Sequence, residues 1–137
     1  MANELIDSAE VLFRHIHPNF MENGEPSSDR FRPSEKDENL LSVDRSALVS
    51  AAEAHALYIG NGRAAVAVFG VSVAEFNGED IGCAEDPILA TDTEKANPAH
   101  ALANYAKHSA KSQKNVAKKL KRLAVERGQL HPSAAEK

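Results

Sequence analysis

The segment over residues 112–127 constrains the fold most, because its pattern is that of a regular amphipathic helix. Its apolar residues recur every three or four positions and form one stripe: Val116, Ala117, Leu120, Leu123 and Ala124. The opposite face carries basic residues: Lys111, Lys114, Lys118, Lys121 and Arg122. Gly128 and then Pro132 follow, which predicts that the helix ends at residue 127. Such a helix has to bury its apolar stripe, so the rest of the chain must supply a surface for it.

The other apolar runs are short, and most of them have the length of strands. We predict strands over residues 11–16, 40–44, 64–71 and 81–84, with a short helical lead-in before the first strand. The run over residues 64–71 is apolar on both faces, which is typical of a central strand. Residues 18–39 contain Gly24, Pro26, Pro33 and many charges, so we expect an ordered but irregular loop there.

Two further helices are predicted from their capping residues. Ser46 precedes an Ala- and Leu-rich segment that stops at Gly60, which predicts a helix capped by Ser46. Ser72 and Glu75 have the spacing of a capping box, which predicts a short helix over residues 73–77. Mixed strands and helices predict a single α+β domain over residues 1–130, with a mixed or antiparallel sheet and a frayed tail over residues 131–137.

Charge is distributed unevenly along the chain. Residues 1–100 hold seven Lys and Arg against eighteen Asp and Glu, a net charge of −11, whereas residues 101–137 have a net charge of +7. The basic end could simply attract the acidic body of the same chain, or it could bind an anionic partner such as nucleic acid or an acidic protein surface. Only Tyr105 is an aromatic residue near the basic helix, which disfavours stacking on single-stranded bases.

Cysteine content and hydropathy suggest a cytoplasmic setting. Cys83 is the single cysteine, so no disulfide can form within the chain, and we expect a buried thiol. The first residues lack the basic and then apolar layout of a signal peptide. No apolar run approaches the roughly 20 residues of a membrane helix, so no membrane contact is expected.

Several short motifs occur in a fixed order along most of the chain. They are LFRHIHP at residues 12–18, SS-x-x-F at 27–31, LSVDR at 41–45, Asp86-Pro87, and NPAHA at 97–101. In this set the chain resembles a family of small uncharacterised bacterial proteins, to which no activity is attached. The resemblance implies that these motifs belong to one folded unit, and it favours a strand over a helix for residues 99–106.

The region from Leu12 to Arg45 contains most of the residues that could form a site. Arg14, Ser27, Ser28, Arg45 and His100 could surround an anionic small molecule, because guanidinium groups bind phosphate or carboxylate with two hydrogen bonds. A nearby histidine, His17 or His100, could then act as a general acid or base. The alternative is that both arginines pair with the abundant carboxylates and that the serines form turns.

His15 and His17 form an H-x-H pair, which on a strand would place both imidazoles on one face. A third metal ligand would have to come from His100, Asp44 or Glu75, and no spacing indicates one, so no metal is predicted. The sequence has no Gly-rich phosphate loop and no G-x-S-x-G motif, so no cofactor is predicted either.

The sequence therefore predicts a small binding or accessory protein that meets an anionic partner through Lys111, Lys114, Lys118, Lys121 and Arg122. The alternative is a small enzyme acting on a phosphorylated or nucleotide-like substrate. Its candidate catalytic residues are Arg14, His17, Ser28, Arg45 and His100.

Overall fold

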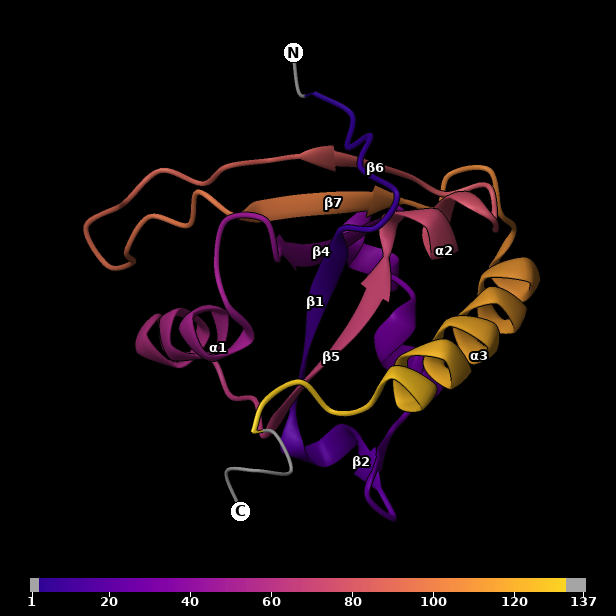
Figure 1. Cartoon of the computed structure of the whole chain (residues 1–137), viewed down its shortest axis with the longest axis horizontal. Helices are drawn as coiled ribbons and strands as arrows, with labels where there is room; N and C mark the ends of the chain where they lie inside the picture. Colours follow the sequence, from indigo (N-terminus) through magenta and orange to yellow (C-terminus); the bar gives the residue numbers. More distant parts are fainter. Residues whose placement is uncertain (1–2, 133–137) are drawn as a thin grey trace.

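The central sheet contains five strands, and every neighbouring pair is antiparallel (Figure 1). The computed structural model describes residues 3–132, apart from the side chain of Glu35. In chain order the strands of this sheet are β1 (Val11–Ile16), β4 (Leu40–Arg45), β5 (Ala67–Ser72), β6 (Gly82–Glu85) and β7 (His100–Asn104). Their order across the sheet is β5-β1-β4-β7-β6. With the helices, they form the small single α+β domain that the sequence predicts.

Helices cover both faces of the sheet (Figure 1). On one face α1 (Ala51–Gly60) packs through Ala54 against Phe13 and Val68. On the other lie α2 (Val73–Asn77) and α3 (Ala110–Arg127), where Leu120 joins the larger core cluster. Side chains alternate along β1, so one strand contributes to both cores.

The segment between β1 and β4 is ordered but irregular, as the sequence predicts. It contains η1 (Pro18–Phe20), a hairpin of β2 (Met21–Glu22) and β3 (Glu25–Pro26), η2 (Ser28–Phe31) and η3 (Glu35–Asp37). Phe31 anchors this segment, since its side chain is only 1% exposed and its carbonyl accepts a 2.5 Å hydrogen bond from the hydroxyl of Tyr105. One buried aromatic residue thus holds a largely polar loop against the body of the domain.

Two local predictions for the N-terminal half of the chain are wrong. Residues 4–10 form no helix: Glu4 and Leu5 run beside β6, where Leu5 donates its N–H to the carbonyl of Cys83, and the carbonyls of Ser8 and Glu10 accept from the first residues of α2. The helix predicted from Ser46 begins at Ala51, because Ser50 and Glu53 form a complete capping box. The hydroxyl of Ser46 instead accepts a hydrogen bond from the N–H of Val11.

The predicted central strand is an edge strand. β5 is buried along its whole length, as its composition indicates, yet it pairs within the sheet only with β1. Its outer edge is covered by the residues that follow α3: Leu130 donates to the Val68 carbonyl, and Val68 donates to the His131 carbonyl, both at 2.8 Å. Covering an edge with a returning segment protects it from pairing with another chain, which explains how an edge strand can be buried along its whole length.

The remaining elements confirm the sequence predictions. The capping box of Ser72 and Glu75 begins α2, residues 100–104 form a strand, and Gly128 ends α3. Cys83 is 1% exposed, and burial, followed by the charges of Glu4 and Glu10, raises the pKa of its thiol to about 12. No helix in the described part of the chain is long and apolar enough to cross a membrane. Residues 133–137, most of the predicted frayed tail, lie outside the described residues.

Candidate functional site

The pairing between β1 and β4 stops early, and the candidate site lies where it stops. The two strands pair only through Leu12 with Arg45 and Phe13 with Asp44. Beyond this point the guanidinium of Arg14 bridges to β4 through a 3.1 Å hydrogen bond from Nη1 to the Ser42 carbonyl. A cationic side chain therefore takes the place of strand–strand hydrogen bonds.

A cleft of about 600 Å³ opens at this place, which we call the β1–β4 cleft. Its walls come from β1, β4, η2, η3, the end of α1 and the loop over residues 86–99, which reaches across toward α1 (Figure 1). That loop is held to the end of α1 by the Arg63–Glu94 ion pair at 2.7 Å. Asn61 also exchanges two hydrogen bonds with the backbone of Lys95. The principal lining residues are Arg14, His15, Arg30, Lys36, Asp37, Asp44, Leu57, Tyr58, Ile88, Leu89, Asn97 and His100.

Two arginines form the basic end of this cleft. Arg14 donates from Nε to the Arg30 carbonyl at 2.6 Å, and Arg30 donates from Nη2 to the His15 carbonyl at 3.1 Å. All three acceptors of these guanidinium groups are neutral carbonyls, and no carboxylate of a described residue lies within 4 Å of either. Burial and the adjacent charge of Arg30 lower the pKa of Arg14 to about 10, so it is still cationic at neutral pH.

The carboxylate of Asp37, which also lines the cleft, is already hydrogen-bonded within its own turn. Asp37 accepts hydrogen bonds from the hydroxyl and the backbone N–H of Ser34, which lower its pKa. Asp37 and Lys36 of η3 thus add one charge of each sign, and the excess of positive charge from Arg14 and Arg30 remains. Arg14 and Arg30 are half-buried, and cations withdrawn from water without a carboxylate partner are costly, so this arrangement favours an anionic ligand.

A buried histidine and aspartate lie on the floor of the cleft. His15 Nε2 is 2.8 Å from Asp44 Oδ2, and the other oxygen of Asp44 accepts from the side-chain amide of Asn97 at 2.8 Å. Burial alone would raise the pKa of Asp44, but the bonds from His15 and Asn97 outweigh it and hold the pKa below its usual value. The imidazole of His15 stacks on Tyr58 with the ring centroids 4.2 Å apart.

Two buried side-chain nitrogens in the described residues lack any hydrogen-bond partner, and both belong to this cleft. They are Nδ1 of His15 and Nε of Arg30. Buried polar atoms without partners are rare in folded proteins and often mark functional sites. Their occurrence together supports the β1–β4 cleft as the candidate site.

His100 lies on β7, directly opposite Asp44 of β4, and its imidazole also lines the cleft. Its Nδ1 is 3.0 Å from both the backbone carbonyl and the carboxylate of Asp86. A carbonyl oxygen only accepts, so Nδ1 carries the proton and the neutral ring has its lone pair on Nε2. His100 can therefore accept a proton or a hydrogen bond at Nε2.

The other predicted catalytic residues lie elsewhere. His17 lies beyond the end of β1 and caps η1, where its Nδ1 accepts from the N–H of Asn19, and it does not line the β1–β4 cleft. No group of three metal-binding side chains occurs in the part of the chain described. Ser27 caps η2, and Ser28 is the first residue of that turn; neither lines the cleft.

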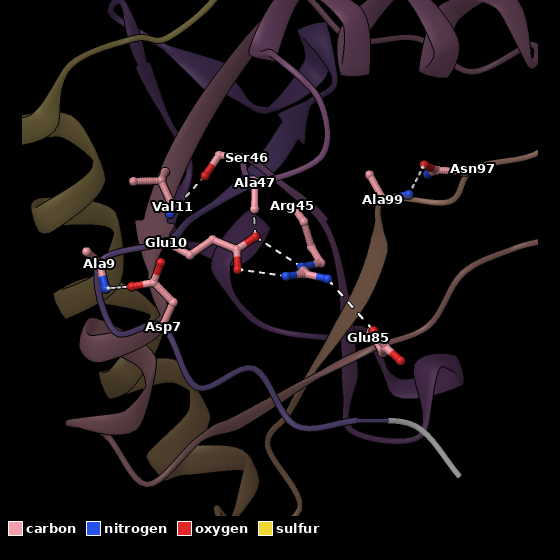
Figure 2. Close-up of polar contacts among 10 residues, drawn as sticks. All are labelled: Asp7, Ala9, Glu10, Val11, Arg45, Ser46, Ala47, Glu85, Asn97 and Ala99. Carbon is pink, nitrogen blue, oxygen red and sulfur yellow. Dashed lines mark hydrogen bonds and ion pairs between the residues drawn. The ribbon is translucent and has the colours of Figure 1, made fainter.

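Arg45 is a structural residue rather than part of the cleft. Its guanidinium donates two hydrogen bonds to the carboxylate of Glu10, from Nε at 3.0 Å and from Nη2 at 3.1 Å (Figure 2). The carboxylate of Glu85 lies 3.8 Å from Nη1. Arg45 pairs with Leu12 in the sheet, whereas Asp44, one position earlier, faces the cleft. The predicted set of Arg14, Ser27, Ser28, Arg45 and His100 is therefore split, and of these residues Arg14 and His100 line the β1–β4 cleft.

The sequence places Arg30 in the likeliest region for a site, from Leu12 to Arg45, but Arg30 was not among the candidate catalytic residues, Tyr58 was not selected, and Asp44 was considered only as a metal ligand. Arg30 lies within the SS-x-x-F motif, so the motif itself was a usable signal. The pairing of His15 with Asp44 depends on the register of β1 against β4, which is not visible in the sequence.

The basic helix is where the sequence predicts it. Lys111, Lys114, Lys118 and Arg122 are exposed on α3, whereas Lys121 is partly buried and 3.4 Å from Glu25. We call the four exposed residues the basic stripe. No family model, curated protein or solved structure matches this chain.

Proposed function

We propose that the chain binds a phosphorylated small molecule in the β1–β4 cleft. The observation that carries this proposal is the pair Arg14 and Arg30, two adjacent guanidinium groups that line the cleft and have no carboxylate partner among the described residues. A phosphate or carboxylate group would supply the missing negative charge and accept several charge-assisted hydrogen bonds.

The size and the other walls of the cleft favour an organic phosphate over a free anion. A volume of about 600 Å³ lies in the range of sites for small organic ligands. Leu57, Tyr58, Ile88 and Leu89 offer apolar contacts, and the Leu89 side chain is largely exposed at the cleft. The cytoplasmic location expected from the sequence would provide phosphorylated metabolites of this kind.

Arg14→Lys tests this proposal while keeping the charge. We expect the wild-type protein to bind both inorganic phosphate and adenosine monophosphate in a calorimetric titration, and the variant to bind each at least about tenfold more weakly. The reason is that lysine retains the cation but loses the planar, two-pronged donor geometry. Arg122→Lys makes the same chemical change on the exposed face of α3 and should leave both affinities unchanged. Equal affinity in wild type and Arg14→Lys, or no binding by the wild type, would refute the proposal.

A small enzyme acting on the same ligand is the second candidate, favoured by Nε2 of His100. In this reaction a water oxygen attacks the phosphorus while His100 Nε2 takes the proton of the water. The bond from phosphorus to the ester oxygen breaks, and that oxygen leaves with the electron pair and then takes the proton from the His100 imidazolium to become the alcohol. Arg14 and Arg30 would neutralise the phosphoryl oxygens.

Turnover of p-nitrophenyl phosphate tests this second candidate, because its leaving group needs no proton. We expect slow release of p-nitrophenolate by the wild type and a loss of about 100-fold in His100→Gln, which cannot accept the proton. Phosphate binding should survive in His100→Gln. If the wild type released no p-nitrophenolate, the enzyme candidate would be refuted and only the binding function would stand. Equal release by the wild type and His100→Gln would exclude His100 as the base.

A further inference from the structure

The exposed face of α3 carries its cations in one line. Lys111, Lys114, Lys118 and Arg122 are three or four residues apart, so they form a single stripe along the helix. With a rise of about 1.5 Å per residue, the basic stripe is about 16 Å long. The buried residues of α3, such as Val116 and Leu120, lie on the opposite side.

These cations form no ion pair with the described residues. Lys119 and Lys121, which flank the stripe, lie 3.6 Å from Glu79 and 3.4 Å from Glu25. In contrast, no carboxylate of a described residue lies within 4 Å of any residue of the stripe. Lys114, Lys118 and Arg122 follow one another at four-residue spacing, where like charges destabilise a helix. A polyanion bound along the stripe would remove this repulsion.

We infer that the basic stripe binds the phosphate backbone of double-stranded nucleic acid without sequence preference. The exposed face of α3 has one exposed apolar residue, Ala110, and the half-buried Val125 packed against the core, whereas protein interfaces centre on apolar and aromatic residues. It also has no aromatic residue on which an unpaired base could stack. Lysine contacts to phosphates need neither feature. This surface is separate from the β1–β4 cleft and does not depend on the function proposed there.

Salt dependence measures this contact directly. We expect the full-length protein to bind a fluorescein-labelled DNA duplex of mixed sequence, with the logarithm of the binding constant falling by about 3.6 per tenfold rise in salt, for four phosphates neutralised. Lys118→Gln should reduce this slope by about 0.9 and weaken binding at low salt. Lys119→Gln removes the same charge from the adjacent position, already paired with Glu79, and should leave the slope unchanged.

Three results would overturn the inference. The first is an absence of duplex binding at low salt by the wild type. The second is an equal effect of Lys118→Gln and Lys119→Gln, because binding would then follow net charge and not the stripe. The third is competition by poly-glutamate as effective as that by unlabelled duplex, because the stripe would then serve acidic polypeptides. Arg14→Lys, which changes only the cleft, should bind the duplex like the wild type.

Discussion

Glu10→Ala is expected to lower the free energy of unfolding by about 3–5 kcal/mol, the usual cost of removing one partner of a buried ion pair. The Glu10 side chain is 3% exposed and accepts three hydrogen bonds: from Nε and Nη2 of Arg45, and from the backbone N–H of Ala47 at 3.3 Å (Figure 2). Without it the Arg45 guanidinium, whose side chain is 19% exposed, has only Glu85 at 3.8 Å. Unfolding in urea, followed by circular dichroism, measures the difference.

Two variants make this result specific to burial. Asp29→Ala breaks the exposed Arg32–Asp29 pair, in which the Asp29 side chain is 61% exposed, and should cost less than about 1 kcal/mol. The double variant Glu10→Leu, Arg45→Met removes both charges and keeps similar volume, so it should recover most of the loss. If Glu10→Ala costs no more than Asp29→Ala, the Glu10–Arg45 pair does not hold the N-terminal segment.

This ion pair also explains why the sequence could not separate an arginine paired with a carboxylate from one that lines the β1–β4 cleft. Arg14 and Arg45 both lie in segments of strand composition, VLFRHI and LLSVDR, and each could have paired with any of many carboxylates. Glu10 reaches Arg45 because β1 and β4 pair through Leu12 and Arg45, a register set by the whole sheet. Arg14 lies beyond that pairing and meets only carbonyl groups. The partner of a charged residue is determined by contacts between residues far apart in the sequence. The sequence could therefore identify both arginines as candidates, but it could not show which of them has a carboxylate partner.

Local elements were more predictable than their arrangement. The α3 stripe, the capping box of Ser72 with Glu75 and the strand composition of β1 are determined by residues within a few positions of one another. The start of α1 was missed because two serines, Ser46 and Ser50, could each have capped it, and only Ser50 has a glutamate three residues later. The edge position of β5 was missed because Leu130 and His131, far along the chain, cover it. The composition of β5 therefore predicted that the strand is buried, but it could not predict that the strand lies at the edge of the sheet.

Phe31→Ala is expected to lower the free energy of unfolding by about 3–5 kcal/mol, because a large buried aromatic side chain is removed and the irregular segment cannot collapse to fill its space. Phe31 is the last residue of η2 and is 1% exposed in the larger core cluster. The residue before it, Arg30, reaches into the β1–β4 cleft and accepts the bond from Arg14 at its carbonyl. A shift of η2 should therefore loosen the basic end of the cleft as well as destabilise the fold.

Leu120→Ala separates these two effects. Leu120 is fully buried on α3 in the same core cluster, so its truncation should cost about 2–5 kcal/mol, but it contributes nothing to the cleft. Both variants would be titrated with inorganic phosphate at low temperature, under conditions where circular dichroism shows them folded. We expect Phe31→Ala to bind phosphate about tenfold more weakly, from the loss of one charge-assisted contact, and Leu120→Ala to bind it like the wild type. Equal stability losses with equal phosphate binding would mean that η2 anchors the fold without positioning Arg30. If Phe31→Ala were as stable as the wild type, the packing of this segment against α3 would contribute little to the domain.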